Sequence, residues 1–248
     1  MAEQIKYATI TEVRNFTGVQ TTEISDTAVT EMLKAASGII DRKTHKYWRG
    51  QVVVTDEMYD GDGTTVLYLD KNDVRSLTAL SVDHDLNGVF TTVTTSKVLL
   101  YEDLGKLMLN TAVYSNLEVT AFSKGYQNVK VSYTYGLDTS TTGTSTSVGV
   151  ATLTDTGKTW TVNQWIDNIL QDSGGSTYQI LSNTATALTL DTTLTPAAGA
   201  YRILEKVPDE VKYVCKLIVA NMMKLETGRE TQINSLLQNL AVQKATIV

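Results

Sequence analysis

The chain has 248 residues, of which 42% are apolar, with a formal net charge of -6 and one cysteine, Cys215. An acidic chain is poorly suited to gripping nucleic acid through its phosphates, and a single cysteine excludes an intrachain disulfide. The first ten residues lack the apolar core of a secretory signal, and no apolar run reaches the roughly 20 residues that cross a bilayer. We therefore expect a protein made in the cytoplasm, without membrane contact.

Two helices are predicted near the N-terminus. Thr9 and Glu12 have the spacing of a capping box, and Gly18 follows as a stop signal. A longer helix is predicted over residues 25–47, because apolar residues recur in steps of three and four and so share one face. These apolar residues are Val29, Met32, Leu33, Ala36, Ile39 and Ile40.

The middle of the chain predicts antiparallel strands. Short β runs flank three turn signals, at residues 60–63, 83–88 and 103–105, which predicts three hairpins. The polar stretch 138–147, DTSTTGTSTS, indicates a linker. A second β segment is then predicted over residues 148–204.

Helix is predicted again from Pro208, with Asp209 and Glu210 at the positive N-terminal end. We expect this helix to pack on the helix of residues 25–47. The expected contact joins Met32, Ala36 and Ile40 to Val214, Ile218 and Met222.

The last amphipathic stretch has an apolar stripe formed by Ile233, Leu236, Leu237 and Leu240. No partner for this stripe is evident within so small a set of helices. It either packs back on the fold or docks on another chain.

Gly157-Lys158-Thr159 has the ending of a phosphate-binding loop, but the rest of the motif is absent. The required upstream glycine is replaced by Thr152, and the following residues, TWTVNQW, do not predict a helix. A polar turn that leads to a buried Trp160 explains the stretch better.

No catalytic or metal site is predicted. DGDGTTVLYLD lacks the glycine and the glutamate that a calcium loop needs at its sixth and twelfth positions. His84 lies in a turn between two aspartates, and neither it nor His45 has the surroundings of a nucleophile motif. We expect no enzymatic activity and no cofactor.

The order of these segments resembles the head–tail connector, or adaptor, proteins of long-tailed bacteriophages. The resemblance is carried by YATITEVRNFTGVQTTEISDTAVTEMLKAASGIIDRKTHKYW, YDGDGTTVLYLDKNDVRSLTALSVD, VKVSYTYGL and VPDEVKYVCKLIVANMMKLE, within residues 7–138 and 207–226. The departure is a β segment that is itself similar to a small β module of phage structural proteins. In that module Trp160 and Trp165 are the expected core anchors.

The resemblance implies a dodecameric ring of this chain beneath the portal protein, located in the virion neck. It also implies a downstream neck, stopper or tail-terminator partner, and double-stranded DNA that passes through without sequence-specific binding. In the resembled family the C-terminal segment docks on the portal, which makes Ile233, Leu236, Leu237 and Leu240 the expected portal interface.

The expected fold is therefore α+β, with a helical frame of two long helices plus short ones, an antiparallel β region and an inserted small all-β domain. The expected division is residues 1–138 plus 207–248 for the frame and 139–206 for the module. The alternative function is a β-module carbohydrate-binding or adhesion protein carried on a helical oligomerisation unit.

Overall fold

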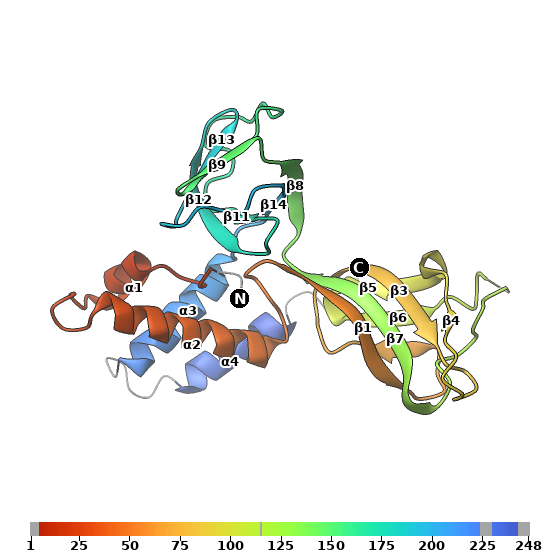
Figure 1. Cartoon of the computed structure of the whole chain (residues 1–248). Coiled ribbons are helices and arrows are strands. Elements are labelled where there is room, and N and C mark those ends of the chain that lie inside the picture. The colour runs from red at the N-terminus through yellow and green to blue at the C-terminus, as the bar shows by residue number, and fades with distance from the viewer. Residues whose placement is uncertain (1–4, 115, 224–229, 243–248) are drawn as a thin grey trace. The chain divides into compact units, whose positions relative to one another are not determined.

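A computed structural model describes residues 5–114, 116–223 and 230–242 of the chain. These residues form two compact units, which are described separately (Figure 1). Within the described residues, the first unit comprises 5–44, 48–50, 137–223 and 230–242, and the second comprises 45–47, 51–114 and 116–136.

The helical layer of the first unit begins with the predicted capping box. The Thr9 side chain accepts from the amide of Glu12 (3.1 Å), and the Glu12 carboxylate accepts from the amide of Thr9 (2.7 Å). Gly18, with a φ of 74°, ends the first helix in the left-handed conformation that glycine adopts without strain. The helices are α1 (Ile10–Thr17), α2 (Asp26–Thr44), α3 (Asp209–Met222) and α4 (Glu230–Val242).

The core of the helical layer is shared by all four helices. α2 packs against both α3 and α4 (Figure 1), and their inward residues form one apolar cluster. Ile169 and Leu204, two buried residues of the β segment, belong to the same cluster. The β segment therefore contributes directly to the helical core.

The β segment of the first unit forms a seven-stranded antiparallel sheet in the order β8-β14-β11-β12-β13-β10-β9. Its strands are β8 (Thr139–Thr144), β9 (Ser147–Gly149), β10 (Thr152–Thr154), β11 (Ile169–Gln171), β12 (Thr177–Asn183), β13 (Ala187–Leu190) and β14 (Ala200–Leu204). We call residues 139–204 the β module. Its own core comprises Leu153, Trp160, Leu170, Tyr178, Ile180, Leu188, Leu190, Tyr201 and Ile203.

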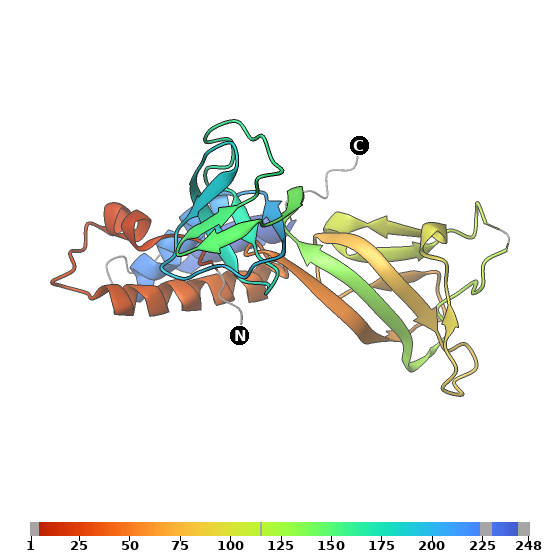
Figure 2. The same cartoon turned by 45° about the horizontal axis from the view of Figure 1, so that its top comes forward.

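The second unit contains two antiparallel sheets around one core (Figure 2). One has the order β1-β7-β3-β4, with β1 (Gln51–Gly61), β7 (Gly125–Gly136), β3 (Val74–Val82) and β4 (Thr91–Thr92). The other has the order β2-β6-β5, with β2 (Val66–Tyr68), β6 (Lys106–Leu109) and β5 (Val98–Tyr101). Two short 3-10 turns, Thr95–Lys97 and Glu102–Leu104, flank β5.

The predicted helical frame is wrong. The described residues are mostly β, with three sheets and fourteen strands against four α-helices, and the fold is α+β overall. Strands fill the chain from Gln51 to Leu204, where threonine and other β-branched residues concentrate, because such side chains suit a pleated surface better than a helix. The predicted linker is also wrong, since residues 139–144 are the strand β8.

Two of the three predicted hairpins are confirmed. β3 pairs with β4, and β5 pairs with β6 through a turn that ends at Gly105. The hairpin around residues 60–63 is wrong, because β1 pairs with β7 and β2 pairs with β6. The glycine-rich turn instead packs on a distant segment. The amide of Gly63 donates to the carbonyl oxygen of Phe122 (2.7 Å), and a Cβ at Gly61 would lie 2.0 Å from the carbonyl oxygen of Ser123.

Candidate interaction site

The C-terminal stripe lies on the inner face of α4. Ile233, Leu237 and Leu240 are buried in the helical core, and Leu236 is half-buried at its edge. Besides Glu230 in its first turn and Asn234, α4 exposes five polar, uncharged side chains, namely Thr231, Gln232, Ser235, Gln238 and Asn239. We call these five residues the amide face. The stripe packs back on the fold and leaves the amide face exposed.

The residues predicted to join the two long helices are brought together. Ala36, Ile40, Val214 and Ile218 are buried in the helical core, and Met32 and Met222 pack against the same cluster while half-buried. Their step of three or four residues places them on facing sides of α2 and α3.

A groove of about 360 Å³ runs between α3 and α4. It is lined by Asp209, Glu210, Tyr213, Val214, Leu236, Asn239 and Leu240. We call it the α3–α4 groove. The Tyr213 side chain is 38% exposed there, and its ring meets Phe16 edge-on at 6.0 Å between centroids. An apolar floor with two carboxylates at one end suits a protein partner that presents apolar and basic side chains.

Sequence reasoning missed this groove. It interpreted the two acids at the start of α3 only as partners of the positive helix terminus. Tyr213 precedes Val214 and lies off the apolar stripe of α3. A large aromatic side chain outside the apolar face of a helix was therefore the sequence signal that could have indicated the groove.

The Gly-Lys-Thr stretch of the β module is a turn built on a buried aspartate. Asp155 accepts from the amide of Gly157 (3.0 Å) and from the Tyr201 hydroxyl (2.7 Å). Burial raises the pKa of Tyr201 above its ordinary value, so this hydroxyl keeps its proton and remains a donor. The Lys158 ammonium donates to the carbonyl oxygen of Thr142 (2.6 Å) in the strand β8. Lys158 therefore joins the turn to a strand of the same sheet.

Replacing Lys158 by alanine is expected to lower the free energy of unfolding by no more than about 1 kcal/mol, because it removes one exposed hydrogen bond. Calorimetry with ATP and Mg²⁺ is expected to show no binding to either protein. Micromolar binding that disappears in the variant would contradict this interpretation of the loop.

The two tryptophans of the β module lie in or beside its core. Trp160 is 9% exposed and buried in the core, and Trp165 packs against the same cluster while half-buried. They occupy the positions that the sequence predicts for core anchors.

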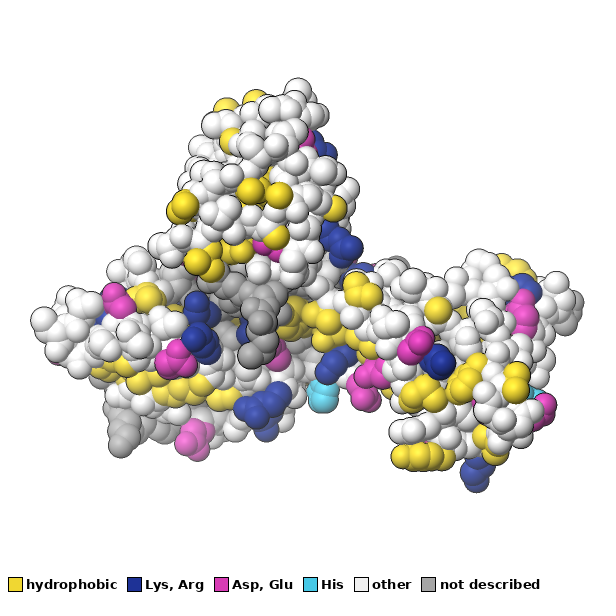
Figure 3. All heavy atoms as spheres, viewed as in Figure 1, with side chains coloured by type: hydrophobic (Ala, Val, Ile, Leu, Met, Phe, Trp, Pro, Cys, Tyr) yellow, Lys and Arg dark blue, Asp and Glu magenta, His cyan; other side chains and the backbone are white. Residues whose placement is uncertain are grey.

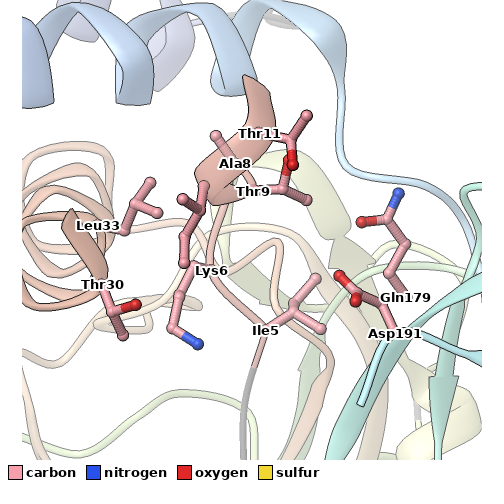
Figure 4. A pocket seen from close by; sticks show the side chains of 10 residues that line it. Ile5, Lys6, Ala8, Thr9, Thr11, Thr30, Leu33, Gln179 and Asp191 are labelled. Carbon is pink, nitrogen blue, oxygen red and sulfur yellow. The ribbon is translucent and has the colours of Figure 1, made fainter. Parts of the chain in front are cut away.

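A second cavity, of about 340 Å³, lies in the first unit where the helical layer meets the β module. Figure 4 shows Lys6 and Thr30 on one wall and Gln179 and Asp191 on the other. The amide nitrogen of Gln179 donates to Asp167 (2.7 Å). The polar walls make this cavity a place for water or a polar chain segment.

No protein-family model matches the sequence, and no curated protein matches it. Two solved structures that match part of the chain are particles of a gene transfer agent. One is described as the neck of an empty gene transfer agent particle computed with C6 symmetry, with 22% identity and a TM-score of 0.30. The other is the virion of the native particle, with 23% identity and a TM-score of 0.31. Each match covers 51% of this chain and 64% of the other, so this chain spans less than two thirds of their length.

Candidate metal ligands are dispersed in the part of the chain that the structure describes. Across residues 5–114, 116–223 and 230–242, no three or more His, Cys, Asp or Glu side chains lie together as metal ligands would. Asp62 accepts from the amide and hydroxyl of Thr64, which makes it part of a turn. Burial raises the pKa of the Cys215 thiol to about 12, so this cysteine is unreactive near neutral pH. None of the described helices is long and apolar enough to span a bilayer.

Proposed function

We propose that this protein is a structural component of a virion neck, an adaptor that forms a ring beneath the portal, extends the DNA channel and joins head to tail. The ordered resemblance of the sequence segments to head–tail adaptors supports this proposal. The observation that carries it is the surface of α4, which presents an open groove on one flank and the amide face outward. Such a helix is suited to a stable contact with another protein.

The portal contact is proposed on α4. Three of its four apolar stripe residues are occupied by the helical core, so the contact uses the amide face, with Leu236 at its edge. Amide and hydroxyl groups suit such a contact, because protein interfaces carry about one hydrogen bond per 100–200 Å² and a similar number of bridging waters.

The charge distribution suits a DNA conduit. The net charge is -6, and on the face shown in Figure 3 the basic and acidic side chains are dispersed rather than gathered into a basic patch. Phosphate binding requires clustered Lys and Arg, so DNA would pass without being held. The proposed assembly is a dodecameric ring with a stopper or tail-terminator protein on its tail side.

Placing two charges on the amide face tests the portal contact. Ser235→Asp combined with Gln238→Asp is expected to weaken co-sedimentation with portal about tenfold or more, because unpaired carboxylates would be desolvated in the contact. The free energy of unfolding is expected to stay within about 0.5 kcal/mol of the original, since both positions are exposed.

Thr27→Asp is the matched control, because Thr27 is an exposed helical position in the first turn of α2. It is expected to bind portal normally. Unchanged binding by the Ser235 and Gln238 variant would remove α4 as the portal contact. Absence of ring-shaped particles in electron micrographs, with and without portal, would remove the adaptor proposal itself.

The carbohydrate-binding alternative has less support. Exposed aromatic side chains on the β module would favour it, but the large apolar side chains exposed in the described part of that module are aliphatic: Val150, Val162, Ile166, Leu181 and Leu194.

A further inference from the structure

The outer face of the sheet β2-β6-β5 exposes large apolar side chains. Because side chains alternate between the two faces of a strand, Leu67, Leu107 and Val98 point toward the core of the second unit. The opposite face shows Tyr68, Leu99 and Tyr101, which are 64%, 39% and 40% exposed. The whole outward set is Val66, Tyr68, Leu99, Tyr101, Lys106 and Met108, which we call the tyrosine face.

Strand pairing arranges the tyrosine face in two rows. Tyr68 and Tyr101 lie on either side of Lys106, and Val66 and Leu99 lie on either side of Met108. The two tyrosines are separated by two strand spacings, on the order of 10 Å. Six adjacent side chains of this kind form a continuous surface, and tyrosine is enriched among the residues that dominate protein interfaces.

The tyrosine face carries one positive charge. The Lys106 ammonium lies 4.7 Å from the centroid of the Tyr101 ring, a cation–π contact. Among the residues that the structure describes, Lys106 makes no ion pair. A partner that brings carboxylates to an apolar surface would therefore complement this face.

The α3–α4 groove has these complementary properties. Tyr213 and Leu236 supply apolar surface, and Asp209 and Glu210 are exposed at one end in the first turn of α3. Neither acid forms an ion pair with another described residue. One surface of this chain is thus apolar and positive, and another is hollow, apolar and negative.

We propose that the tyrosine face of one copy docks in the α3–α4 groove of the next copy, with Lys106 against Asp209 and Glu210. This contact rests on the proposed function in that it joins neighbours in the ring. Two tyrosine faces in contact would bring like charges together, as would two grooves, so pairing of unlike surfaces is favoured. A head-to-tail contact of unlike surfaces generates a closed ring when its rotation closes.

A charge exchange tests the pairing. Lys106→Glu alone, and Asp209→Lys with Glu210→Lys, are each expected to weaken self-association of the full chain about tenfold in sedimentation velocity. A chain that carries all three changes is expected to recover, because opposite charges again meet at every contact. Weakening by each change without recovery in the combined variant would overturn the pairing.

Cross-linking identifies the partner surfaces. Tyr101→Cys and Tyr213→Cys are made in separate chains and mixed, and a short bis-maleimide is added. Cys215 does not interfere, because it is buried and its pKa is raised. Linkage of position 101 to position 213 between the two variants is expected. Linkage only of like positions, or none, would overturn the inference.

The outcome for the ring is recorded separately in electron micrographs. Rings that persist through the charge reversals would contradict this contact and leave the adaptor proposal standing. If the chain forms no rings with or without portal, both proposals fail. A glycan array tests carbohydrate as the alternative ligand of the tyrosine face. Glycan binding by the original protein that is lost in Tyr68→Ala and Tyr101→Ala would assign this face to carbohydrate.

Discussion

Replacing Leu237 by aspartate is expected to unfold the helical layer. The Leu237 side chain is 4% exposed within the core shared by α2, α3 and α4. Removing a buried leucine costs about 2–5 kcal/mol, and an unpaired carboxylate in its place adds several more. Because a domain is stable by only about 5–15 kcal/mol, this loss removes most or all of its stability. The measurement is chemical denaturation followed by helical circular dichroism.

Gln238→Asp is the matched control for this substitution. Gln238 is the next residue on the same helix, it is exposed, and the introduced charge is the same. Its unfolding midpoint is expected to shift little. A Leu237→Asp protein as stable as the Gln238→Asp protein would show that α4 does not pack on the other helices in solution.

Replacing Asp172 by alanine is expected to destabilise the first unit by about 3–5 kcal/mol, because the buried donors around it lose their acceptor. Asp172 is 6% exposed and accepts from the amides of Gly174 and Ser176 at 2.9 Å each and of Ala197 at 2.8 Å. The Tyr178 hydroxyl donates to it as well (3.3 Å). Asp172→Asn keeps one acceptor oxygen and is expected to lose about half as much.

Asp191→Ala serves as the control, because Asp191 is an exposed residue of the same module. Its backbone amide donates a hydrogen bond to the carbonyl oxygen of Gln179, and this bond does not involve the side chain. Denaturant titration should give a change below about 0.5 kcal/mol for this variant. Equal stability of the Asp172→Ala and Asp191→Ala proteins would mean that the loop around Asp172 does not need its carboxylate.

The parts of the fold that depend on neighbouring residues were predictable from the sequence. The capping box of Thr9 and Glu12 requires two side chains three residues apart, and the β5–β6 hairpin requires a turn that Gly105 can make. In both cases the interacting groups are close in the chain, so local preference and tertiary structure agree.

The parts that depend on distant residues were not predictable. Asp60-Gly61-Asp62-Gly63 has the composition of a hairpin turn, but β1 pairs with β7, whose first residue lies far along the chain. Threonine-rich residues 139–144 look like a linker by composition, yet β14 pairs with five of these six residues, and Ser140 lies at a register shift. A single sequence does not show which distant strand will satisfy the backbone of a polar segment.

The candidate site shows the same division. Periodicity placed Ile233, Leu237 and Leu240 on one face of a helix, and the structure does the same. Whether that face packs within this chain or against another protein depends on how much apolar surface α2 and α3 leave open. No local sequence pattern gives this area. The α3–α4 groove arises from the offset between two helices, so it has no signature in the sequence of either one.

Ile169 and Leu204 couple the β module to the helical layer of the first unit through shared packing. Their side chains lie in the apolar cluster of the helices while their backbones are paired to each other in adjacent strands, β11 and β14. A force applied to the module would therefore reach the helical core through packed side chains as well as through residues 205–208, which lead into α3. Strain at the tip of the module would thereby reach the apolar cluster that also holds the buried side chains of α4, the helix of the proposed portal contact.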